Sequence, residues 1–144
     1  MLTNGETSNY EIIRFAQKLG IPLKSVCFNH QFAQLKPEPG FYVINLGNQR
    51  IGGTHWTGAL LTSENLYYFD SAGTPPPPSV EIFAKAAKVH DIVYSQTQIQ
   101  SINENYCGQF VLMWMYDMMT SKLPKIEDRY QQFLNKFHKL RHIT

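Results

Sequence analysis

The spacing of apolar residues predicts a helix near the start of the chain. Apolar side chains recur at positions 12, 13, 16 and 19, which share one helix face. Ser8 and Glu11 have the spacing of a capping box, and Gly20 ends the segment. Residues 21–40 contain three prolines and little periodicity, so we expect irregular chain there with a short strand at 25–28.

Strand patterns follow in the middle of the chain. Residues 41–46 are rich in β-branched and aromatic side chains and end at Gly47-Asn48. Residues 55–62 and 65–70 are two more short runs of the same character, joined by Ser63-Glu64. They predict a β-hairpin and hence a sheet of at least three strands.

The second half of the chain is predominantly helical. Four prolines at 75–78 predict an extended spacer that ends at Ser79, a candidate N-cap for a helix over 80–89. A strand is expected at 91–94 and irregular polar chain at 96–105. Residues 107–121 are apolar nearly all round, which predicts a buried central helix that begins at Cys107. An apolar stripe from Ile126 to Leu140 predicts a last helix.

Length and composition favour one domain spanning residues 1–144, and the strands and helices expected above make its fold class α+β. The chain is 43% apolar and 13% aromatic, which is enough for a core. No apolar run approaches the roughly 18 residues of a membrane span, and the N-terminus lacks the pattern of a secretory signal. We therefore expect a protein that is neither secreted nor membrane-bound, in a reducing compartment. Two cysteines, Cys27 and Cys107, do not suggest a disulfide framework.

Positive charge is concentrated at the C-terminal end. The net charge is only +2, but residues 122–144 contain six Lys or Arg and two acids. A basic helix could contact nucleic acid or an acidic partner, although a solvated helix face is the simpler explanation.

Cys107 is a candidate nucleophile. A thiol attacks as thiolate, and a helix N-terminus or a neighbouring imidazole lowers its pKa. Cys107 precedes the long apolar helix, and Gly108 leaves room for a substrate carbonyl beside the backbone. A cysteine at a helix start is also found in inert packing, so this feature alone does not decide the function.

His55 and Asp70 are candidate partners of the thiol. His55 follows Gly52-Gly53 at the start of a predicted strand, and Asp70 ends the next one. In a hairpin the start of one strand lies beside the end of its partner, so Asp70 could orient the imidazole. The alternative for Asp70 is an Asx-type turn with the residues that follow.

An oxyanion stabiliser is the fourth part of such a site. A side-chain amide together with the backbone N–H of Cys107 would serve. Gln100 is a candidate for the amide, and composition alone does not separate it from the three other glutamines nearby, Gln96, Gln98 and Gln109.

These motifs resemble a known protease family. Three separated motifs are similar to those of the adenovirus protease, adenain. They are residues 53–56 (Gly-Thr-His-Trp), residues 68–73 (Tyr-Phe-Asp-Ser-Ala-Gly), and Gln100 placed seven positions before Cys107-Gly108-Gln109-Phe110. The proteases specific for SUMO and other ubiquitin-like proteins share the signature more distantly.

The resemblance implies a thiol peptidase with a mixed sheet flanked by helices. It makes Cys107 the nucleophile, His55 the base, Asp70 the orienting acid and Gln100 the oxyanion donor. It also suggests Trp56 as a substrate contact, with a rim or core aromatic as the alternative. Adenain has Glu at the Asp70 position, whereas the shorter Asp matches the SUMO-protease side.

Other classes of protein fit the sequence less well. Papain-like enzymes place the cysteine before the histidine, and the caspase signature Gln-Ala-Cys is missing around Cys107. A zinc site could combine Cys27-x-x-His30 with His138-x-x-x-His142, but these halves lie far apart in the sequence. An inactive protease-like interaction module, with the proline run as a ligand, would not need all four catalytic residues.

The expected function is therefore that of a cysteine endopeptidase without cofactor or metal. The resemblance implies viral capsid or virion precursors as substrates, cleaved near small residues such as glycine, with ubiquitin-like modifiers as the alternative. It also implies a location in the virion and the host cytoplasm or nucleus. The adenovirus enzyme is activated by a peptide and by DNA, and the basic C-terminal helix here is compatible with such partners.

Overall fold

The central feature of the fold is a mixed β-sheet. The computed structural model describes residues 8–47, 55–99 and 106–143, with side chains described as far as residue 137. Over these residues one sheet contains, in spatial and sequence order, β1 (Leu23–Phe28), β2 (Gly40–Asn45), β3 (Trp56–Leu61), β4 (Asn65–Phe69) and β5 (Asp91–Tyr94). The two outer pairs are parallel and the two inner pairs antiparallel. The expected hairpin is the β3–β4 pair.

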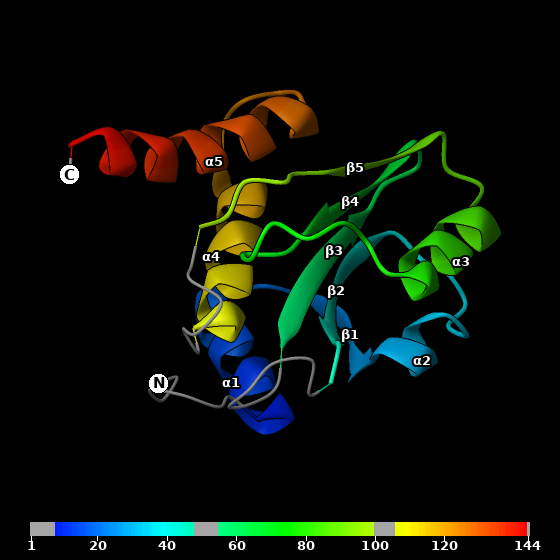
Figure 1. Ribbon diagram of the computed structural model, residues 1–144. Helices are drawn as coiled ribbons and strands as arrows, with labels where there is room; N and C mark the ends of the chain where they lie inside the picture. Colours follow the sequence, from blue (N-terminus) through cyan, green and yellow to red (C-terminus); the bar gives the residue numbers. More distant parts are fainter. Residues whose placement is uncertain (1–7, 48–54, 100–105, 144) are drawn as a thin grey trace.

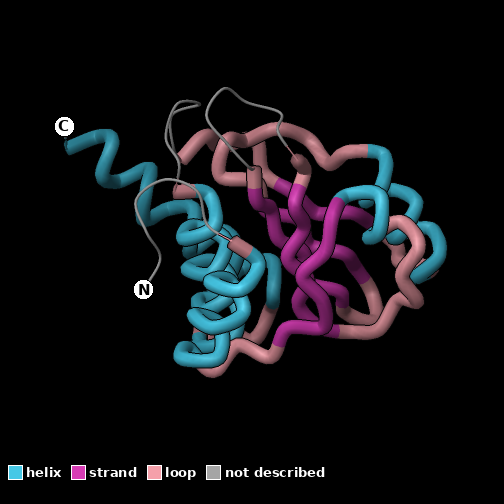
Figure 2. The backbone as a smooth tube through the Cα atoms, turned by 90° about the horizontal axis from the view of Figure 1, so that it is seen from below, coloured by secondary structure: helices cyan, strands magenta, loops and turns pink. Residues whose placement is uncertain are grey.

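Helices cover both faces of this sheet. α1 (Asn9–Leu19), α4 (Cys107–Thr120) and α5 (Ile126–Ile143) lie on one face, and α2 (Asn29–Phe32) and α3 (Pro78–Ala87) lie on the other (Figures 1 and 2). The predicted α+β fold, a mixed sheet flanked by helices with Cys107 at the start of a buried helix, is confirmed. Among the described residues, no helix is both long and apolar enough to cross a membrane.

Alternation along the strands divides the core between the two faces. Successive strand residues point to opposite faces of a sheet. Trp56 and Leu60 of β3 therefore pack toward α4, while Ala59 and Leu61 pack toward α3. Cys27 belongs to the α3 side and Cys107 to the α4 side, so the sheet separates the two thiols.

Two sequence predictions for the local structure were wrong. The short strand expected at 25–28 is present as part of β1, but residues 21–40 are more regular than expected, because β1 begins at Leu23 and α2 follows it directly. Helix α3 begins at Pro78 rather than after Ser79, with Pro77 as its N-cap. Proline suits the first helical position, where its missing N–H would have no helical partner. Ser79 instead donates its hydroxyl to Asn29 Oδ1 of α2.

The central helix α4 approaches β3 closely at Gly58. A Cβ at this position would lie 2.9 Å from Val111 Cγ1 and 3.1 Å from Met115 Cε, so only glycine fits without repacking. At the C-terminal end of α4, α5 connects that helix to the sheet. Tyr130 donates its hydroxyl to the Tyr68 carbonyl of β4, and Arg129 Nη1 donates to the Met118 carbonyl of α4 at 2.8 Å.

Candidate active site

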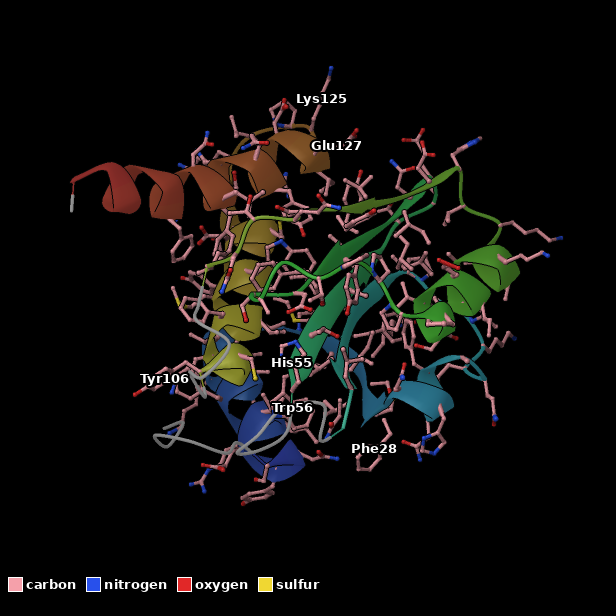
Figure 3. The ribbon with its side chains drawn as sticks, in the orientation of Figure 1. Phe28, His55, Trp56, Tyr106, Lys125 and Glu127 are labelled. Atoms are coloured by element: carbon pink, nitrogen blue, oxygen red, sulfur yellow. The ribbon has the colours of Figure 1, made fainter. Side chains whose placement is uncertain are left out.

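Three segments that are distant in sequence bring His55, Asp70 and Cys107 together. His55 directly precedes β3, Asp70 directly follows β4, and Cys107 is the first residue of α4. The antiparallel register pairs Gly58 with Phe69, which places the start of β3 beside the end of β4. In Figure 3, His55 and Trp56 are labelled at the start of β3, and Tyr106 is labelled at the start of α4.

The imidazole of His55 and the carboxylate of Asp70 form a buried pair. His55 Nε2 lies 2.8 Å from Asp70 Oδ1, and the two side chains are 4% and 0% exposed. The Ala72 amide also donates to Oδ1, at 2.8 Å, and the Thr74 hydroxyl donates to Oδ2. Asp70 therefore makes the Asx-type turn and also contacts the histidine, although the sequence suggested these as alternatives.

The two partners shift each other's pKa in opposite directions. Burial acts to lower the pKa of His55, but hydrogen bonds to Asp70 and Cys107 outweigh it and raise that pKa to about 9. Burial acts to raise the pKa of Asp70, but the His55 contact, the Thr74 hydroxyl and the Ala72 amide together lower it. The arrangement favours imidazolium and carboxylate over the two neutral groups.

Cys107 is held against the histidine from two directions. Its side chain hydrogen-bonds the His55 ring, and the Trp56 amide donates to Sγ at 3.3 Å. The residue is 4% exposed and occupies the first turn of α4, where the helix dipole favours negative charge. Because Nε2 faces Asp70, Nδ1 is the ring nitrogen that can exchange a proton with the sulfur.

The remaining predicted site residues have different outcomes. Gln100 lies outside the described residues. The described chain before it reaches Ile99, whose amide donates to the Ser71 carbonyl at 2.8 Å beside the Asp70 turn. The Trp56 side chain is 1% exposed and packs in the core, in keeping with the core-aromatic alternative; its role as a substrate contact stays a prediction.

The possible zinc ligands are likewise only partly described. Cys27 lies in β1 and His30 in α2, whereas the side chains of His138 and His142 are outside the described set. Among the side chains that the structure describes, no three from His, Cys, Asp or Glu are grouped so as to hold a metal ion.

Sequence reasoning missed two contacts: the amide of Trp56 and the hydroxyl of Thr74. The Ala72 amide is the donor of the Asx-type turn that the sequence suggested. The Trp56 amide carries no side-chain signal. Thr74 could have been noticed, because a hydroxyl two residues beyond the end of an Asx turn is within reach of the carboxylate that makes the turn.

Comparisons with known proteins place the fold but not a family. No protein-family model and no curated protein sequence matches this chain. Among solved structures, the ASFV pS273R protease matches with a TM-score of 0.52 and 17% identity, over 92% of this chain and 67% of that one. AvrA delL154 with IP6 and CoA matches with a TM-score of 0.50 and 17% identity, over 86% of this chain and 52% of that one. At this identity the likeness concerns the fold alone, and a specific relation to adenain stays a prediction.

The raised pKa of His55 predicts a pH-dependent stability. A group whose pKa is higher in the folded than in the unfolded state stabilises the fold fully below its unfolded value, near 6.5, and loses that contribution as pH rises through about 9. The free energy of unfolding in urea should therefore fall by about 1 to 3 kcal/mol between these pH values. Asp70→Asn should remove most of this dependence.

A matched control is His90→Gln, because His90 is exposed and its amide bonds the Glu64 carbonyl at the turn between β3 and β4, away from His55. It should leave the pH dependence as in the unmodified protein. An equal slope in the unmodified protein and in Asp70→Asn would show that the buried pair does not control it. An NMR titration of the His55 ring measures the same pKa directly.

Proposed function

We propose that this protein is a cysteine peptidase with Cys107 as nucleophile, His55 as general base and acid, and Asp70 as the orienting carboxylate. The observation that carries the proposal is the convergence of these three side chains from the starts or ends of β3, β4 and α4. His55 contacts Asp70 at 2.8 Å and hydrogen-bonds Cys107, which is the order of contacts that nucleophilic catalysis requires. The fold likeness to a protease agrees with this assignment.

The chemistry follows from the positions of the protons. The Cys107 thiolate attacks the scissile carbonyl carbon, and the imidazolium of His55 gives its proton to the leaving amine. A thioester remains on Sγ. His55, now neutral, takes a proton from water, which attacks the thioester, releases the carboxylic acid and leaves the Cys107 thiolate beside the His55 imidazolium again. Asp70 stabilises the imidazolium in both half-reactions, and the Cys107 amide with Gln100 would bind the developing oxyanion.

The finer function rests on the sequence resemblance. We propose an endopeptidase that cleaves capsid or other virion precursor proteins near small residues such as glycine, in the virion and in the host cytoplasm or nucleus. Ubiquitin-like modifiers are the alternative substrates, and an inactive interaction module is the alternative to an enzyme. On the basis of the same resemblance, we propose that a peptide or DNA bound at the basic C-terminal helix activates the enzyme.

Cys107→Ala should abolish peptide hydrolysis, because no other group can form the thioester. The rate should fall by at least about 10⁴-fold, and labelling by a thiol-reactive active-site probe should disappear. Cys27→Ala is the matched control, since this thiol is also buried and outside any disulfide but lies on the other face of the sheet. Hydrolysis by Cys107→Ala, or loss of activity only in Cys27→Ala, would contradict the assignment.

The same assay separates hydrolysis from acyl transfer. The AvrA structure contains CoA, and a thioester on Cys107 could pass its acyl group to an amine instead of water. Mass spectrometry of peptide products, with and without an acyl-CoA, distinguishes the two. Acylated peptide without cleavage would contradict the peptidase proposal.

Substrate class can be decided with two kinds of protein. Virion precursors with Gly-containing junctions should be cut internally, whereas a ubiquitin-like protein with a C-terminal extension should stay intact. Mass spectrometry of the fragments identifies the bond cleaved. Release of the extension alone would instead favour the modifier-protease alternative.

Repeating the assay with DNA at low and high salt tests whether DNA activates the protein, because electrostatic binding to DNA weakens as the salt concentration rises.

Gln100→Ala should lower kcat by about 10²- to 10³-fold with little change in KM, because an oxyanion donor acts mainly in the transition state. Gln96→Ala, Gln98→Ala and Gln109→Ala form the control panel, since the sequence alone does not separate these glutamines. Steady-state kinetics on one peptide compares all four variants. A larger loss in any control than in Gln100→Ala would move the oxyanion role to that residue.

A further inference from the structure

The carboxylate of Asp70 uses its two oxygens for different purposes. Oδ1 accepts from both His55 Nε2 and the Ala72 amide, each at 2.8 Å. Oδ2 accepts from the hydroxyl of Thr74. Asp70 is 3% exposed, so water has little access to either oxygen. The mechanism above uses Oδ1 and leaves the Thr74 contact without a role.

The backbone around Thr74 is shaped to bring its hydroxyl back to Asp70. Gly73 has φ of +76°, a left-handed conformation that suits glycine, and its amide donates to the Asp70 carbonyl at 2.9 Å. A Cβ on Gly73 would lie 2.7 Å from the Gln96 carbonyl oxygen, so the turn packs tightly against the chain after β5. On the other side, Pro75 restricts Thr74 to extended conformations.

We propose that Thr74 is a positioning residue for the proposed reaction, acting through Asp70 on His55. Its hydroxyl satisfies Oδ2 and fixes the plane of the carboxylate, so that Oδ1 stays directed at Nε2. A carboxylate that lacked this donor would be buried with one oxygen unpaired and could rotate away from the ring. This gives a role to the first residue of the proline run, because Pro75 restricts the backbone of Thr74 and so holds its hydroxyl in place.

The exposure of Thr74 determines which substitution is informative. Thr74 itself is exposed although the carboxylate beneath it is buried. In Thr74→Ala a water molecule could replace the lost hydroxyl. In Thr74→Val a methyl group of similar size occupies that place and keeps water out. The expected order of activity is therefore the unmodified protein and Thr74→Ser first, then Thr74→Ala, then Thr74→Val.

Steady-state kinetics and NMR on the full chain test this order. Thr74→Val should lower kcat about tenfold with KM unchanged, in line with the net worth of a hydrogen bond to a charged group. Thr74→Ser should restore kcat to within about twofold, since it keeps the donor. The downfield NMR signal of the His55 Nε2 proton should move upfield in Thr74→Val and stay in place in Thr74→Ser.

Thr62→Val is the matched control. Thr62 also has a hydroxyl that bonds within a turn, but that turn joins β3 and β4 at the end of the hairpin away from His55. This variant should leave kcat and the His55 signal unchanged, even where it lowers stability. If Thr74→Val did not fold, the ratio of kcat between Thr74→Ser and Thr74→Ala would decide, and equal values would overturn the proposal.

The proposed role of Thr74 rests on the peptidase assignment, but different results would overturn the two. Activity in Cys107→Ala would remove both. An inactive Cys107→Ala together with unaltered kcat and NMR signal in Thr74→Val would overturn only the role of Thr74.

Discussion

The close contact between α4 and β3 is the constraint on which the candidate site depends. Gly58 lets the helix backbone approach the central strand, with Val111 and Met115 filling the space that a side chain would take. The same contact places the first turn of α4 against the start of β3. Cys107 Sγ thereby comes within 3.3 Å of the Trp56 amide, next to His55. Packing in the core therefore sets the distance between the nucleophile and the base, which no local turn could do.

Burying an imidazolium and a carboxylate is costly, and the structure offsets this cost with hydrogen bonds. Removing each ion from water costs several kcal/mol, and the attraction between the two compensates only where the remaining polar atoms are also satisfied. Asp70 meets this condition through the Ala72 amide and the Thr74 hydroxyl. The raised pKa of His55 and the lowered pKa of Asp70 are the result. A buried pair of this kind is by itself weak evidence for stability.

The sequence predicted the features that depend on periodicity and missed those that depend on a single contact. The apolar run after Cys107 and the β3–β4 hairpin were clear from pattern, and the hairpin alone placed Asp70 beside His55. Residues 21–40 were harder, because the short strand and the four-residue helix there carry too few residues for a period to appear. The start of α3 depended on proline at the first helical position. The Trp56 amide depends on tertiary geometry, because its partner Cys107 lies 51 positions further along the chain, whereas the Thr74 hydroxyl is four residues from Asp70 and could have been noticed.

The choice of Asp over Glu at position 70 follows from the turn that the carboxylate makes. Here Oδ1 reaches the amide two residues ahead and the histidine at once, and the Asx geometry requires the short side chain. One more methylene would displace the carboxylate from the Ala72 amide and from the Thr74 hydroxyl. The shorter acid is therefore coupled to the sequence Ser71-Ala72-Gly73-Thr74, and the local turn and the long-range pair are parts of one arrangement.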